Sequence, residues 1–96
     1  MKAVEIFRSK QVINSAELIE VVIWQVPTPM PPSDHDFKYS LVFIRDGVRV
    51  VGYDNERGKG DHKHINGVEY VYAFTTLAKL FEDFEADVAF IRGEPT

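Results

Sequence analysis

Residues 37–53 read FKYSLVFIRDGVRVVGY, and this stretch decides the fold. Alternation places a set of apolar side chains on one face of a first strand: Phe37, Tyr39, Leu41 and Phe43. Asp46-Gly47 is a strong signal for a two-residue hairpin turn, and a run rich in β-branched residues follows from Val48 to Tyr53. We therefore predict two antiparallel strands joined by a tight turn.

The chain before this hairpin predicts more sheet. Residues 17–26 are rich in β-branched residues and have apolar side chains on both faces, which predicts a strand covered on both sides. Residues 2–13 alternate weakly and predict a first hairpin arm that is broken at Arg8-Ser9-Lys10. Four prolines in residues 27–33 prevent ladder hydrogen bonds and predict a loop.

The chain after the hairpin predicts one more strand and then a helix. The polar residues 54–61 interrupt the pattern, and residues 68–74 alternate again as a last strand. Thr75 or Thr76 can cap a helix that Gly93 and Pro95 would end. Apolar residues recur within it at spacings of three and four: Leu77, Leu80, Phe81, Phe84, Val88 and Ile91.

These elements predict an α+β fold. We expect residues 1–96 to form a single small domain, with about five antiparallel strands in a twisted sheet and a C-terminal helix packed on one face. A chain of 96 residues with 45% hydrophobic and 27% charged residues can build one modest core and a shallow site.

Composition excludes several classes of function. The absence of cysteine excludes disulfide scaffolds, thiolate metal sites and cysteine nucleophiles. The longest apolar run, Val21 to Trp24, is far too short to cross a membrane, and the N-terminus lacks the apolar block of a signal peptide. We therefore expect a cytoplasmic protein.

Charge is unevenly distributed in a chain whose formal net charge is −4. Residues 76–96 hold five acidic and two basic residues, whereas residues 45–64 hold five basic and four acidic residues together with two histidines. We expect the acidic helix to repel RNA and an anion to bind on the opposite side of the sheet, near Arg45, Arg49, Arg57 and Lys59.

The segment GYDNERGKGDHKH at residues 52–64 has the highest density of reactive side chains. Gly58 and Gly60 permit positive φ and a close backbone approach to a phosphate, and Arg57 and Lys59 supply positive charge. The spacing is not that of a Walker A loop.

His62 and His64 are two residues apart, so in an extended chain they lie on the same face, where Asp61 could orient a neighbouring imidazole. Cleavage of RNA through its 2′-hydroxyl needs a proton acceptor, a proton donor and cations at the phosphate. Surface decoration is the plainer interpretation of a His-x-His pair. A metal site made of His62, His64 and Asp61 or Asp54 is a rival. His35 could be a third ligand or a third catalytic group, and a turn cap is the plainer interpretation.

Residues 51–64, preceded by PSDHDFKY at residues 32–39, resemble the TumE family of small bacterial and archaeal toxins. The resemblance extends to the strand containing Val22-Ile23-Trp24 and to the closing helix. It implies the toxin half of a two-gene toxin–antitoxin pair, with a small helix-turn-helix antitoxin as partner. By analogy of size and layout, it also implies the compact endoribonuclease class.

The family pattern matches Tyr53, Asp54, Asn55, Gly58, Gly60, Asp61, His62 and His64, and also His35, Lys38 and Tyr39. From side-chain chemistry we assign catalysis to His62, His64, Asp61, Arg57 and Lys59. Substrate binding is assigned to Tyr53, Asp54, Asn55, Gly58, Gly60, His35, Lys38 and Tyr39.

We expect a toxin that acts as a metal-independent endoribonuclease, without a cofactor and without membrane contact. The alternatives are a non-catalytic module that binds a nucleotide or a protein, and a nucleotide-modifying transferase. Net acidity is unusual for an RNA-cleaving toxin. A homodimer is left open.

Overall fold

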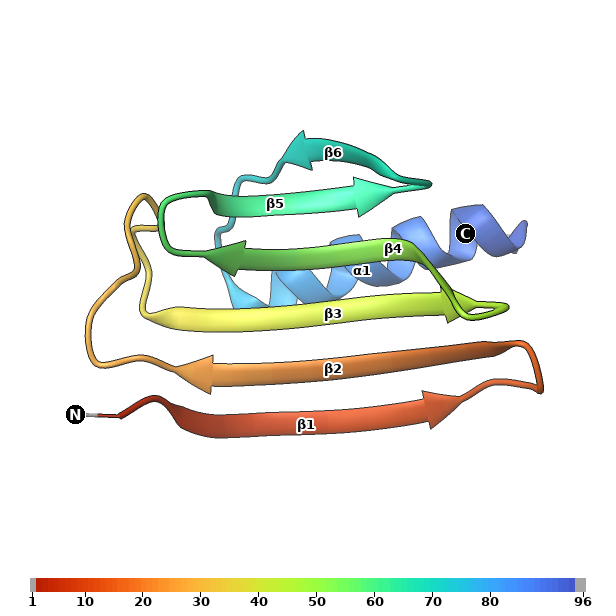
Figure 1. The fold of residues 1–96 in the computed structure, drawn as a ribbon, viewed down its shortest axis with the longest axis horizontal. Coiled ribbons are helices and arrows are strands. Elements are labelled where there is room, and N and C mark those ends of the chain that lie inside the picture. Colours follow the sequence, from red (N-terminus) through yellow and green to blue (C-terminus); the bar gives the residue numbers. More distant parts are fainter. Residues whose placement is uncertain (1, 95–96) are drawn as a thin grey trace.

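The computed structural model describes residues 2–94 as six strands followed by one helix (Figure 1). The elements are β1 (Val4–Val12), β2 (Glu17–Gln25), β3 (Phe37–Arg45), β4 (Val48–Glu56), β5 (Gly60–Ile65), β6 (Val68–Val71) and α1 (Leu77–Arg92). The strands form one sheet in the order β1-β2-β3-β4-β5-β6, each antiparallel to its neighbour. The α+β prediction is confirmed, with six strands in place of about five.

The core lies between α1 and one face of the sheet. Leu80, Phe84 and Val88 of α1 are buried there against Leu41 and Tyr53 and other apolar strand residues. Thr76 caps the helix by accepting a hydrogen bond from the backbone N–H of Lys79. Gly93 ends it with a φ of 72°, which a residue with a side chain adopts less readily. The predicted helix and its apolar stripe are confirmed, whereas Pro95, the other predicted end signal, lies outside the described residues.

The opposite face of the sheet, which carries Val22, Val42, Gly52 and His64, is called the open face because no described element packs across it (Figure 1). Trp24 and Val22 are only half-buried there, so the prediction that the second strand is covered on both faces is wrong. A second layer would be needed to cover this face, and residues 2–94 contain one helix.

Three other strands also differ from the prediction. β1 continues through Arg8-Ser9-Lys10, where we expected a break, because pairing with β2 stabilises an exposed edge strand despite its polar residues. β5 was missed, since residues 60–65 are mostly polar and show no apolar alternation. The chain then turns at Asn66-Gly67, and β6 ends at Val71 rather than at Phe74.

The acidic residues of α1 divide into two groups. Glu82 and Glu85 are exposed. Asp83 accepts a hydrogen bond from the hydroxyl of Tyr72 at 2.7 Å. Asp87 accepts one from Tyr53 and another from Lys63 at 3.1 Å, so these two carboxylates attach the helix to the sheet.

Glu17 provides a pH-dependent connection between the sheet and the end of α1. Its buried carboxylate accepts hydrogen bonds from Arg45 at 2.9 Å, Asn14 at 2.8 Å and Arg92 at 3.2 Å. These bonds, that from Arg45 first, hold the pKa of Glu17 below its usual value of 4.5. Because the folded-state pKa is lowered, this stabilisation is present above pH 4.5 and is lost as the pH falls through the folded-state pKa.

We therefore expect Glu17→Gln to lower the free energy of unfolding at neutral pH. The difference between the parent and the variant should shrink below about pH 4.5, the usual value for this group. Urea denaturation of both proteins across this pH range measures the difference. A gap that stays constant from neutral to strongly acid pH would contradict the assignment.

Candidate functional site

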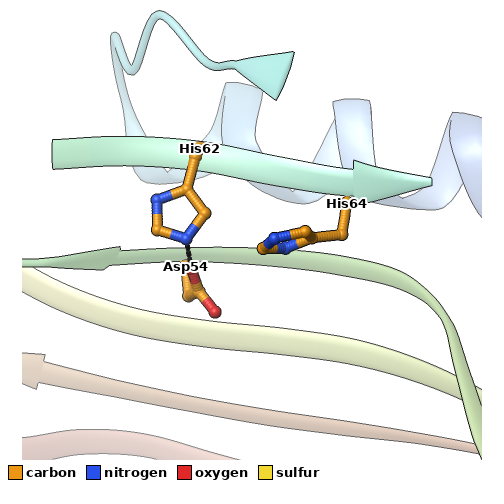
Figure 2. Close-up of side chains that lie close together, drawn as sticks. All are labelled: Asp54, His62 and His64. Atoms are coloured by element: carbon orange, nitrogen blue, oxygen red, sulfur yellow. Dashed lines mark ion pairs between the residues drawn. The ribbon is translucent and has the colours of Figure 1, made fainter. Parts of the chain in front are cut away.

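Three polar side chains meet on the open face of β4 and β5. Asp54 pairs directly with His62 in the strand register, and Gly52 pairs with His64, so alternation places both rings on one side. Figure 2 shows the three side chains together, with His62 joined to Asp54. One nitrogen or oxygen atom from each residue, of the kind that can bind a metal, lies within 4.8 Å of the others. We call Asp54, His62 and His64 the open-face cluster.

His62 is the most enclosed member of the open-face cluster, with 4% of its surface exposed. Its Nδ1 lies 3.0 Å from the carbonyl oxygen of Gly60. A carbonyl only accepts hydrogen bonds, so Nδ1 carries a proton. Its Nε2 is in ion-pair contact with Oδ1 of Asp54, yet that oxygen has no partner with hydrogen-bond geometry.

His64 is held by the next strand. Its Nε2 lies 3.1 Å from Oε1 of Glu69, which is its directly paired residue on β6. Its Nδ1 is buried without a hydrogen-bond partner. Lys59 also contacts Glu69 at 2.5 Å, and this hydrogen bond keeps the pKa of Glu69 below its usual value. Glu69 is thus a charged acceptor that orients His64.

The absence of a side chain at Gly52 leaves space for Arg49 beside the open-face cluster. A Cβ added at Gly52 would lie 2.8 Å from Cδ of Arg49, so the missing side chain lets the arginine pass over this position. Nη1 of Arg49 reaches to 3.8 Å from Oδ2 of Asp54. Arg49 therefore leaves a positive charge next to the acidic member of the cluster.

Asp61 lies apart from the open-face cluster because alternation places it on the face of β5 that carries α1. There it accepts hydrogen bonds from His35 and Tyr39, both at 2.7 Å, and from Ser33. His35 accepts the backbone N–H of Phe37 through Nδ1 at 3.2 Å and stacks on Phe74 at 3.9 Å. The structure thus places Asp61 beside His35, not beside His62 or His64, where it was expected to orient a ring.

Several residues assigned to substrate binding lie inside the protein. Tyr53, Tyr39 and Asn55 are at most 2% exposed. Burial, followed by the bond to Asp61, raises the pKa of Tyr39 well above its ordinary value, so it remains a hydrogen-bond donor. Asn55 binds the backbone of Phe37 and Tyr39. These three side chains cannot face a substrate and serve the fold.

The glycine turn also differs from expectation. The backbone N–H of Gly58 donates to the carbonyl of Pro31 at 2.7 Å, so it is not free for a phosphate. Gly60 has a φ of +78°, and a Cβ there would lie 2.9 Å from Cγ of Pro32. Both glycines therefore pack the proline loop against the turn between β4 and β5.

The family model for Toxin TumE matches residues 3–92, which is nearly the whole chain. The chain belongs to the toxin TumE family. Membership implies a toxin role and suggests an antitoxin as partner. No curated protein and no solved structure matches the chain. Among residues 2–94, no helix has the length and apolar character that crossing a membrane requires.

Two of the predicted basic residues of this TumE-family chain lie at the open-face cluster: Arg49, near Asp54, and Lys59, which binds Glu69. Arg57 is exposed in the turn before β5. Arg45 was expected beside them, but it lies on the helix side in its ion pair with Glu17. Lys38 is on the open face, where its Nζ lies 5.9 Å from the ring centroid of Trp24.

Trp24 and Glu69 lie near the open-face cluster but were not among the predicted site residues. Trp24 lines a hollow of about 210 Å³ that reaches Asp54, together with Lys38, which was predicted. Glu69 lines a larger, open cavity of about 490 Å³, together with Lys59 and His62. The signal for Glu69 was Asn66-Gly67, because a two-residue hairpin fixes the register that places Glu69 opposite His64.

Proposed function

We propose that this toxin cleaves RNA at the open-face cluster. The observation that supports this is the convergence of Asp54, His62 and His64 within 4.8 Å on the sheet face that α1 leaves uncovered. Carboxylates and imidazoles are the groups that move protons or hold metals in phosphodiester cleavage. His62, His64 and Lys59 retain the catalytic role predicted from the sequence. Asp54, which was assigned to substrate binding, is now proposed as a catalytic residue, and Asp61 is assigned a structural role.

The surroundings of the open-face cluster suit a single-stranded polyanion. Lys59, Arg49 and Lys38 place positive charge around it, and Trp24 offers an aromatic surface on the same face. Cations along a backbone path and aromatic rings for base stacking are the usual elements of single-strand binding. Arg57, exposed at the turn, extends the positive charge toward the end of the sheet.

In the proposed reaction the 2′-oxygen of RNA attacks the adjacent phosphorus while its proton passes to a basic group. The new 2′-O–P bond forms as the bond from phosphorus to the 5′-oxygen breaks, and that oxygen takes a proton. A cyclic phosphate and a 5′-hydroxyl result. His64, whose side chain is 15% exposed against 6% for His62, is the imidazole closer to solvent and to a substrate.

From the sequence we expect this reaction to proceed without a metal. His62 is poorly placed to exchange protons with a substrate, because both of its ring nitrogens contact protein atoms. The proposed partner is a helix-turn-helix antitoxin that covers the open face. Because the proposed substrate is RNA, we propose that the toxin acts in the cytoplasm.

RNA turnover tests the proposed function. Purified protein added to single-stranded RNA at a sub-stoichiometric ratio is expected to produce several cleavage events per protein molecule, with cyclic phosphate ends detected by mass spectrometry. DNA of the same sequence, which lacks the 2′-hydroxyl, is the control and should stay intact. Growth arrest without RNA cleavage at any ratio would support the non-catalytic binding module instead.

A further inference from the structure

We propose that Asp54, His62 and His64 bind one divalent transition-metal ion, with zinc as the best fit. The ion would occupy the cluster to which RNA cleavage is assigned, so its use in catalysis rests on the proposed function, whereas its binding does not. One ligand atom from each of the three residues lies within 4.8 Å of the others. Oδ1 of Asp54 and Nδ1 of His64 are buried without a hydrogen-bond partner, and Nε2 of His62 is in contact with Oδ1 of Asp54.

The hydrogen bonds at the other ring positions decide which nitrogens carry lone pairs. Nδ1 of His62 gives its proton to the carbonyl of Gly60, and Nε2 of His64 gives its proton to Glu69. In neutral rings this leaves Nε2 of His62 and Nδ1 of His64 as acceptors. Both nitrogens and the carboxylate oxygen are then acceptors with no donor among them, and a cation satisfies all three at once.

A proton on Nε2 of His62 is a simpler explanation of the contact between His62 and Asp54. Such a proton explains the ion pair with Asp54 but leaves Nδ1 of His64 buried and without a partner. A buried polar atom without a partner has lost its hydrogen bonds to water and gained none from the protein. The proton therefore accounts for one contact, whereas the metal ion also accounts for His64.

Both histidines already have the outer partners that metal-binding imidazoles use. Such rings almost always donate their second N–H to a backbone carbonyl or a carboxylate, which fixes the ring orientation. Gly60 supplies the carbonyl and Glu69 supplies the carboxylate. Lys59 holds Glu69 in turn at 2.5 Å, so the outer partner of His64 is itself fixed.

The ligand set selects the kind of metal. Two imidazole nitrogens and one carboxylate suit zinc and its first-row neighbours, whereas magnesium prefers oxygen ligands. Three protein ligands leave a fourth position for water or substrate, as in catalytic rather than structural zinc sites. Tetrahedral zinc separates its ligand atoms by about 3.3 Å, so Asp54 and His62 must move slightly apart from their contact.

Calorimetric titration of chelator-treated protein with zinc chloride tests the site without any RNA. We expect one zinc ion per chain and no comparable binding of magnesium. Glu69→Gln, which removes the negative charge of an outer partner, should weaken zinc binding by about 10- to 100-fold. His64→Ala, which removes a ligand, should weaken it further.

His35→Gln is the matched control, because His35 is the remaining histidine of the chain and lies on the other face of the sheet. It should bind zinc as the parent does, and circular dichroism should show that each variant is folded. Absence of stoichiometric zinc binding by the parent overturns the proposal, as does equal loss in His35→Gln and His64→Ala. RNA cleavage that persists in the presence of a chelator would support the proposed function but contradict a role for the metal in catalysis.

Discussion

Growth arrest by this toxin is expected to disappear when Asp54 is replaced by asparagine. The two side chains have the same shape, and the side chain of Asp54 is 30% exposed, so the sheet should fold as before. The carboxylate charge that faces His62 is lost whether it serves proton transfer or metal binding. Because general acid–base groups contribute about 10²- to 10⁴-fold to rate, RNA cleavage should fall by at least about 100-fold.

Glu56→Gln is the matched control for this variant. Glu56 lies two residues further along β4 on the same face, is exposed, and forms no ion pair within residues 2–94. It should arrest growth as the parent does. Induced expression in a bacterial host, with protein levels checked by immunoblotting, measures the effect. Arrest by Asp54→Asn equal to that of the parent would remove the open-face cluster from the toxic activity.

Phe84→Ala is expected to lower the free energy of unfolding by about 3–5 kcal/mol. Phe84 is 2% exposed, and its ring meets the ring of Tyr53 edge to face at 5.9 Å. Truncation would leave a cavity where α1 joins the sheet. Because about 1 kcal/mol shifts the melting temperature of a domain this small by roughly 4–8 °C, the midpoint should fall by at least about 12 °C.

Phe90→Ala controls for the loss of an aromatic side chain from the same helix. Phe90 is 79% exposed, so its truncation should change the free energy of unfolding by no more than about 0.5 kcal/mol. Thermal and urea denaturation of both variants compare the two sites. Similar losses at Phe84 and Phe90 would contradict the packing of α1 on the sheet.

The elements that could be predicted from sequence are those with a local cause. Asp46-Gly47 fixes the hairpin between β3 and β4, and Thr76 and Gly93 mark the ends of α1. β5 has no such local pattern, because it has polar side chains on both faces: Asp61 on one, and His62 and His64 on the other. Its strand conformation comes from pairing with β4 and β6, which the periodicity of one segment does not report.

The candidate site divides in the same way. The spacing of His62 and His64 was enough to predict that they share a face. Their partner depends on register, since the turn between β4 and β5 places Asp54 opposite His62. A single residue of slip would move His62 and His64 to the helix side of the sheet, away from Asp54, and would bring Asp61 to the open face.

The order of the strands also bears on how the chain reaches its native state. Each strand of the sheet pairs with the strand next to it in sequence, from β1 through β6. Hairpins can therefore form one after another, with residues 26–36 as the longest loop to close, and mean sequence separation between contacting residues stays low for a sheet of this size. Docking of α1 across the finished hairpins is the step that spans the most chain, so we expect refolding faster than that of a β-sandwich of equal length.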